Sequence, residues 1–174
     1  MKKELTRRSF LKLAGVGTLA VAMSGSLTGC DVIDNLKDMD SVSAAIGDVK
    51  FMLSASAWTN GVGGQENDVT YQPTCEIRNN SKKAVTYGGI GSNCEVIITG
   101  VLTDKNGKEY PMTYVGENGS APAGEKYKVK DFKLVAVGKG LYMEGSKVVT
   151  TFTYNGRKAV FTEYNNGNIT SKVE

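Results

Sequence analysis

Apolar and polar residues alternate with a period of two along most of the chain after Gly47. This period places successive side chains on opposite faces of a strand, so each alternating run predicts a half-buried β-strand. The first inward face is predicted to comprise Val49, Phe51, Leu53, Ala55 and Ala57. Further runs cover 69–77, 84–87, 94–102, 108–115, 126–137, 148–154 and 158–164. With no convincing helical pattern between them, they predict an all-β domain over 47–164, an antiparallel β-sandwich of seven or eight strands.

Turn residues separate these runs. Asn106-Gly107 and Asn155-Gly156 each predict a type I′ hairpin, because both central positions of that turn need a positive φ. Asp104 with Asn106 and Gly107 resembles the start of a calcium loop, but the later ligands of such a loop are missing, which favours the hairpin. Pro73 predicts an edge or a bulge, and a slip of the alternation predicts a bulge near Lys130-Asp131.

The segments on either side of this domain have other patterns. Residues 30–46 are predicted to form a tether, and the apolar spacing from Val32 to Met39 favours a short helix within it. Three aspartates there, at positions 34, 38 and 40, could suggest a cation site, but a solvated acidic face is the favoured interpretation. The tail 165–174 is polar and is expected to be loose.

The first 29 residues have the pattern of an export signal. Thr6-Arg7-Arg8-Ser9-Phe10-Leu11-Lys12 resembles the twin-arginine translocation signal, and a mild apolar run too short to span a membrane follows it. Leu27-Thr28-Gly29-Cys30 resembles a lipobox, the site at which bacterial lipoproteins are cut and acylated. These resemblances imply removal of 1–29, export, and attachment to a membrane through a lipid on Cys30.

The charge of the chain depends on that signal. The whole sequence has 21 basic and 18 acidic residues, whereas removal of 1–29 leaves 16 basic and 17 acidic residues, a net charge of −1. No dense basic run remains, which argues against nucleic acid as a partner. The sequence contains no histidine, so serine–histidine and cysteine–histidine catalysis and histidine-bound zinc or haem are excluded. No cofactor or metal is therefore expected.

Two cysteines follow Cys30, namely Cys75 and Cys94. Because exported domains meet an oxidising compartment, a Cys75–Cys94 disulfide is expected, with two separately buried thiols as the alternative. A bridge there would close a loop of about 20 residues and stabilise the fold by roughly 3 kcal/mol on the chain-entropy estimate. Zinc is disfavoured with only two thiolates and no histidine.

The turns and strand edges carry one further resemblance. Cys75 to Val85, with its N-x-S strand end, Thr103 to Tyr110, and Pro122 to Glu125 before Phe132 look like the Ig-like domains of small bacterial lipoproteins. The resemblance spans about 48–164 and implies an Ig-like sandwich, without implying any activity or catalytic residue.

These features together predict a membrane-anchored, extracytoplasmic, non-catalytic binding or scaffolding module. Its expected partners are the membrane, through Cys30, and an envelope protein or glycan. The alternatives are a carrier or chaperone of a small ligand or cofactor and, less favoured, a hydrolase that uses carboxylates. Since such folds usually bind through loops, Trp58 and Tyr142 are the candidate ligand contacts, although a core or turn position is the favoured interpretation for each aromatic.

Overall fold

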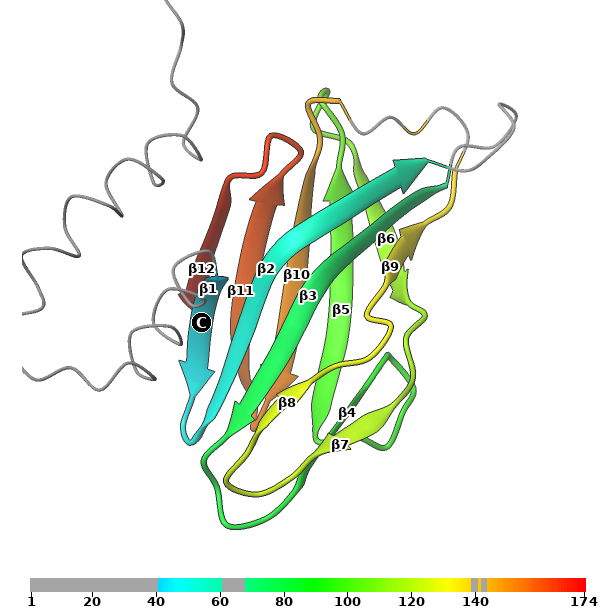
Figure 1. Cartoon of the computed structure of the whole chain (residues 1–174). Coiled ribbons are helices and arrows are strands. Elements are labelled where there is room, and N and C mark those ends of the chain that lie inside the picture. Colours follow the sequence, from blue (N-terminus) through cyan, green and yellow to red (C-terminus); the bar gives the residue numbers. More distant parts are fainter. Residues whose placement is uncertain (1–40, 61–67, 139–140, 142–143) are drawn as a thin grey trace, which may run out of the picture. The chain divides into compact units, whose positions relative to one another are not determined.

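The computed structural model of the chain describes residues 41–60, 68–138, 141 and 144–174, and in these it consists of strands, turns and loops (Figure 1). The export signal with Arg7 and Arg8, the lipid site Cys30, the three aspartates and Tyr142 lie outside the described residues. The described ranges hold no helix long and apolar enough to cross a membrane. The strands are β1 Ser41–Ile46, β2 Val49–Asn60, β3 Val69–Asn79, β4 Val85–Gly88, β5 Val96–Thr103, β6 Glu109–Tyr114, β7 Gly119–Ala121, β8 Lys126–Lys128, β9 Leu134–Ala136, β10 Lys147–Tyr154, β11 Arg157–Tyr164 and β12 Ile169–Val173.

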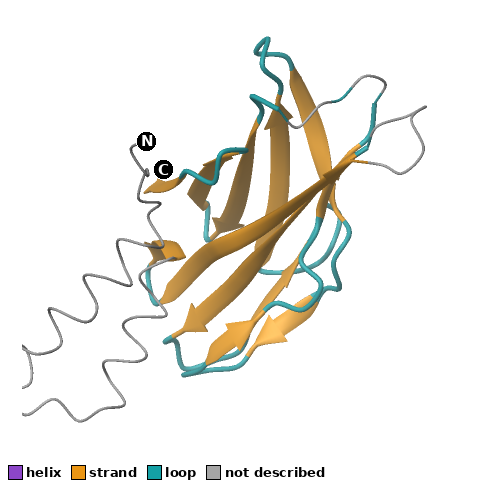
Figure 2. Ribbon diagram, turned by 45° about the horizontal axis from the view of Figure 1, so that its top comes forward, coloured by secondary structure: helices purple, strands orange, loops and turns teal. Residues whose placement is uncertain are grey.

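These twelve strands form two layers that face each other across one core (Figures 1 and 2). Hydrogen bonds follow the order β1-β2-β3-β9-β6-β5-β10-β11-β12, while β8 pairs with β3, and β4 pairs with β5 and β7. Strand β9 pairs with both β3 and β6, so it joins the layers along one side. Along the other side, the Ser171 hydroxyl of β12 donates a 2.8 Å hydrogen bond to the Ser43 carbonyl of β1. The predicted all-β antiparallel sandwich is therefore confirmed, although it is nearly closed and has more strands than expected.

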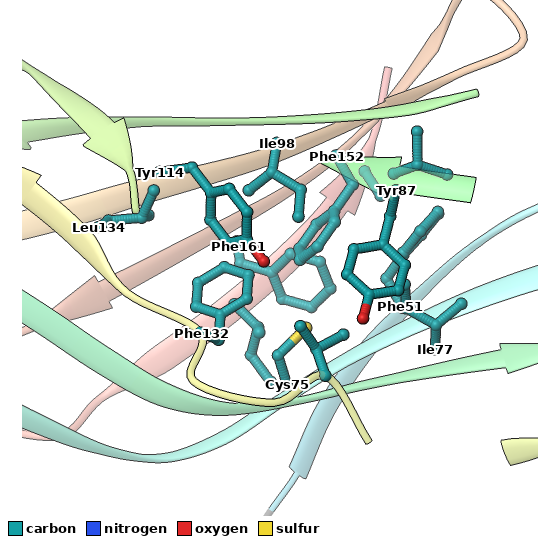
Figure 3. Packing of buried hydrophobic residues seen from close by; sticks show 14 of the residues in the cluster. Phe51, Cys75, Ile77, Tyr87, Ile98, Tyr114, Phe132, Leu134, Phe152 and Phe161 are labelled. Carbon is teal, nitrogen blue, oxygen red and sulfur yellow. The ribbon is translucent and has the colours of Figure 1, made fainter. Parts of the chain in front are cut away.

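Aromatic side chains from both layers fill the core (Figure 3). Phe51 of β2 stacks on Phe152 of β10 with ring centroids 4.8 Å apart, and Phe161 of β11 meets Phe152 edge-on at 5.6 Å. Such pairs contribute about 0.5–1.5 kcal/mol each beyond the burial of their area. The alternation read from the sequence is thus the direct cause of the layered core.

The tether prediction is wrong for its last six residues. Residues 41–46 form β1, which pairs antiparallel with β2 from Ser41↔Ser54 to Ile46↔Val49. The small residues of this segment alternate, so that Ala44 and Ile46 are buried. Gly47, with φ +59°, takes the first position of the two-residue turn into β2, where a side chain would be strained.

The prediction of a loose tail is also wrong. Residues 169–173 form β12, which pairs antiparallel with β11 from Ala159↔Val173 to Glu163↔Ile169. Ile169 packs on the core, and polar residues fill the outward positions. The polar composition of this segment is that of an edge strand with one solvent-exposed face. Polar residues on an edge strand commonly protect the sheet from pairing with another chain.

The predicted long strand 126–137 is two short strands. A turn at Lys130-Asp131 separates β8 from β9, and both strands pair with β3. Asp131 has φ +49°, a conformation that aspartate tolerates better than most residues. The slip in the alternation was located correctly, but it marks a break in the strand instead of a bulge.

The two Asn-Gly turns differ from each other. Asn155 and Gly156 have φ +49° and +74°, which confirms the type I′ hairpin between β10 and β11. Between β5 and β6 only Gly107 has a positive φ, +83°, and its N–H donates to the Asp104 carbonyl at 3.0 Å. This is a three-residue loop with a type I turn, so the type I′ prediction is wrong here. Asp104 Oδ1 accepts hydrogen bonds from the Asn106 and Lys108 amides and fixes the loop.

Candidate functional site

Trp58 lies on β2 and faces the core, because the strand has a bulge. The pairing of β2 with β3 shifts between Ser54 and Ala57, opposite Pro73, which confirms the bulge expected near that proline. The shift moves Ser56 and Trp58 to the inward face and leaves Ala57 exposed, so the predicted inward position of Ala57 is wrong. Trp58 is therefore partly buried and packs against the core.

The Trp58 ring contacts a polar cluster between the layers. It meets Tyr71 of β3 edge-on, with centroids 5.2 Å apart. Its Nε1 donates a hydrogen bond to Ser56 Oγ at 3.0 Å and approaches Glu163 Oε1 at 3.4 Å. Of the two predicted contact aromatics, Trp58 thus has core and polar-cluster contacts, whereas Tyr142 lies outside the described residues.

Glu163 is the centre of this cluster, and the sequence analysis did not single it out. Its side chain lies on β11 and the residue is only 5% exposed. Oε2 accepts a 2.6 Å hydrogen bond from the Tyr71 hydroxyl, and Oε1 accepts one from Ser56 Oγ. Burial, with the adjacent Glu163 carboxylate, raises the pKa of Tyr71 far above its usual range. The alternation Ala159, Phe161, Glu163 was the available signal, since it places all three side chains on one face.

The chemistry of this cluster is that of a polar bridge between β11 and the layer of β2 and β3. Neutral donors surround one carboxylate, and they use both of its oxygens. Carboxylate-based glycoside hydrolysis needs two such groups on either side of a substrate. Among the described residues, no group of three or more acidic or cysteine side chains is placed to hold a metal ion.

The expected Cys75–Cys94 disulfide is absent, and both cysteines are free thiols. Cys75 lies on β3 and its sulfur points into the aromatic core (Figure 3). Cys94 is half-buried and precedes β5, in the opposite layer. Burial raises the pKa of the Cys75 thiol well above its ordinary value. The two thiols are therefore separate, as in the alternative, although only Cys75 is fully buried. Cys75 behaves as a small apolar core residue.

A pocket of about 310 Å³ is lined by residues from the end of the sandwich opposite the Glu163 cluster. The turns that supply this lining lie at the lower end of Figure 1. Three connections meet there: the turn between β1 and β2, the segment between β3 and β4, and the turn between β10 and β11. The buried residues Ile46 and Tyr154 supply apolar surface. The polar lining comes from Asp48, Ser81, Asn155 and Arg157.

Hydrogen bonds hold this end of the domain in place. Asn79 is fully buried, and its Nδ2 donates to the carbonyls of Lys83 and Ala121 at 2.8 and 3.0 Å. Its Oδ1 accepts hydrogen bonds from the N–H and the hydroxyl of Ser81. The Asn80 amide donates to the Asp48 carbonyl at 2.8 Å, which ties two of the three connections together. The Asn79 of the N-x-S strand end is thus a structural anchor for the pocket.

Charges of both signs lie at this end. Arg157 and Asp48 line the pocket itself. Nearby, Lys83 and Glu95 form an exposed ion pair at 2.7 Å. Hydrogen bonding within this pair raises the pKa of Lys83 and lowers the pKa of Glu95. Lys83 is therefore paired, and Arg157 is the cation that lines the pocket.

Comparisons with known proteins give no family. No protein-family model and no curated protein matches the chain. Among solved structures, the Northeast Structural Genomics Consortium target SoR45 is similar at 13% identity over 75% of this chain and 84% of that chain, with a TM-score of 0.36. A calcium-binding mutant of Bacteroides uniformis beta-glucuronidase 2 is similar at 10% identity over 77% of this chain and 14% of that chain, with a TM-score of 0.33. Similarities this weak carry no functional argument, so function must be argued from the residues.

Proposed function

We propose that the chain is a lipid-anchored, extracytoplasmic, non-catalytic binding module. The anchor and the export route rest on the resemblances of Arg7, Arg8 and Cys30 to an export signal and a lipobox. The observation that supports binding most directly is the pocket at the β1–β2 and β10–β11 turns, which combines apolar surface with donors and acceptors. Hydrogen bonds of Asn79 and Asn80 hold two of its three connections in place, and a site that is ordered before binding loses less entropy when a ligand arrives.

The carboxylate of Glu163 is not placed for hydrolysis of a substrate. A catalytic carboxylate must reach a substrate, whereas Glu163 is buried and its oxygens accept hydrogen bonds from Tyr71 and Ser56. A carrier of a small ligand is the second candidate. The pocket volume supports it, because about 310 Å³ is just large enough for a small-molecule site.

The test is crosslinking of the anchored protein in its native membrane, followed by identification of what is captured. We expect one or more envelope components to be captured by the wild type, and capture to fall at least severalfold in Asp48→Ala and Arg157→Ala. Lys158→Ala is the matched control, since Lys158 is exposed next to Arg157 and does not line the pocket. Equal capture by all variants would remove the pocket from the function, and turnover of glycans or peptides by the purified protein would overturn the non-catalytic assignment.

A further inference from the structure

We infer that the pocket at the turn end binds a neutral saccharide unit, such as the end of an envelope glycan. This inference rests on the proposed binding function and names the ligand class of the same site. It is carried by three properties of the pocket: its mixed surface, its balance of charge and its rigidity.

The surface of the pocket matches the two sides of a sugar ring. Ile46 and Tyr154 are 3% and 7% exposed, so the small apolar surface that they present lies at the base of the pocket and not on a protruding rim. A pyranose ring has a face of C–H groups that packs on such a base and loses water there. Its hydroxyls lie around the ring edge, where polar side chains are needed.

The polar lining can both donate and accept. The Arg157 guanidinium offers only donors, the Asp48 carboxylate offers only acceptors, and the Asn155 amide offers both. Each of these planar groups has two adjacent polar atoms, which suits two neighbouring hydroxyls of one sugar. Ser81 Oγ already donates within its own turn, to the Asn79 side chain or the Lys83 carbonyl, so it can offer a ligand only an acceptor.

The charge balance selects against ions. A phosphate or carboxylate would be attracted by Arg157 but repelled by Asp48. A cation would be attracted by Asp48 but repelled by Arg157. A neutral polyol has no such penalty and uses both residues. A zwitterionic amino acid is the competing ligand, because it could satisfy both charges.

Rigidity of the lining adds selectivity. Asn155 is held at φ +49° in the type I′ turn, and Asp48 is joined through its carbonyl to the Asn80 amide. The volume of about 310 Å³ is at the lower end of small-ligand sites, so the pocket suits one or two rings and not a long chain of them.

The experiment is saturation-transfer NMR on the full mature protein in detergent. The probes are the methyl glycosides of glucose, galactose and N-acetylglucosamine, with glycine and inorganic phosphate as separate arms. We expect transfer to the ring C–H protons of at least one glycoside, and affinity about tenfold weaker or worse in Asp48→Ala and Arg157→Ala, since each loses a hydrogen bond to a charged group. Lys158→Ala should bind like the wild type, and Asp48→Asn, which keeps one acceptor, should fall between.

Each other outcome overturns the inference in a recognisable way. Binding of glycine lost in both variants would identify a zwitterion site, and binding of phosphate lost only in Arg157→Ala would identify an anion site. Transfer to no probe, or transfer equal in all variants, would reject a saccharide site here. If native-membrane crosslinking still captures a protein partner in a pocket-dependent way, the proposed binding function stands while the saccharide inference fails. Circular dichroism of each variant confirms that it is folded.

Discussion

Glu163 places a carboxylate among aromatic side chains, where charge is costly unless hydrogen bonds compensate it. Tyr71 and Ser56 donate to its two oxygens, with Trp58 beside them. The donors come from β2 and β3 and the acceptor from β11, so the cluster links strands that are not neighbours in the hydrogen-bonded order. Its contribution is therefore to fix how the layers face each other.

Replacing Glu163 tests this bridge. Glu163→Ala should lower the free energy of unfolding by roughly 2–4 kcal/mol, because buried donors lose their acceptor and a cavity remains. Glu163→Gln should cost less, since one acceptor oxygen persists. Urea denaturation measures both, and Glu109→Ala, at an exposed carboxylate, should change stability by about 0.5 kcal/mol at most. A neutral or stabilising Glu163→Ala would show that the network is not needed.

Buried tyrosines make the protein sensitive to alkali. Burial raises the pKa of Tyr71 and Tyr87, and raises that of Tyr114 to about 12. Between pH 10 and 12 the folded protein keeps these protons, whereas the unfolded chain, whose tyrosines titrate near 10, has lost them. Stability is therefore unaffected by these groups below about pH 10 and should fall above it, by up to about 1.4 kcal/mol per pH unit for each tyrosine. The buried Cys75 thiol adds an effect of the same sign.

The measurement is urea denaturation at a series of pH values from 7 to about 11.5. Tyr114→Phe should make the alkaline decline shallower, apart from a constant loss from the hydrogen bond to the Glu117 carbonyl. Stability that stays constant through pH 11 would contradict the assignment.

The two thiols should react differently with a maleimide. In a Cys30→Ser variant kept without reductant, the half-buried Cys94 should label in the folded protein, and fully buried Cys75 only after denaturation. Mass spectrometry counts the labels. If the denatured, unreduced protein takes up none, the two cysteines are bridged and their free state is wrong.

At the level of single residues, sequence alternation predicted much of the core and failed where the strands are irregular. It placed Phe51 and Leu53 inward correctly, but it could not count the extra residue of the bulge opposite Pro73. Trp58 was chosen as a candidate contact because it stands beside the Gly-rich stretch 60–64 of the sequence, but it lies in β2 and packs against the core, the alternative that was favoured. Glu163 was missed because an acidic residue on an alternating face is usually exposed, and only the partners on distant strands reveal its burial.

At the level of elements, local sequence decides turns only when strand register agrees. Asn155-Gly156 connects strands paired as Tyr154↔Arg157, which leaves two residues for a type I′ turn. Asn106-Gly107 lies in a longer connection, with Thr103 paired to Glu109, and Asp104 caps it. The dipeptide is the same, and the register selects the turn type.

A pair of matched substitutions tests this difference. Asn155→Ala should lower stability by about 1 kcal/mol or more, since alanine is strained at a positive φ. Asn106→Ala should have an effect of about 0.5 kcal/mol or less, because Asn106 has an ordinary φ and the hydrogen bond to Asp104 uses its backbone N–H. Equal losses in urea denaturation would contradict the assignment of the turns.

Edge elements were the ones that sequence analysis missed. The segments 41–46 and 169–173 are short and rich in small or polar residues, and each has only one strand neighbour. Each pairs with the strand next to it in the sequence, β1 with β2 and β12 with β11, so it was their small and polar composition that hid them, because it shows no clear apolar alternation. The pocket was missed for a different reason, since Asp48, Ser81 and Arg157 are far apart in the sequence and come together only through the fold.

For the whole molecule, the sequence established the fold class but not the closure of the two layers or the free state of Cys75 and Cys94. The export signal and the lipobox remain sequence predictions.

An intact mass of the membrane-extracted protein should correspond to a chain that starts at an acylated Cys30. Cys30→Ser should abolish acylation, and replacement of Arg7 and Arg8 by lysine should leave precursor in the cytoplasm. An unmodified Cys30, or a different start, would reject the anchor.

The contact of β1 with β12 has a consequence for the order of events in the cell. Strand β1 can pair with β2 at once, but Ser43 and Ser171 are 128 positions apart, so the contact of β1 with β12 must wait for almost the entire chain. At roughly 5–20 residues per second of synthesis, that wait is about 6–26 s. Closure of the two layers is therefore a late step, completed only when the ribosome has finished the C-terminal strand. A transport route that accepts proteins after folding suits this timetable better than one that threads the chain while it is being made.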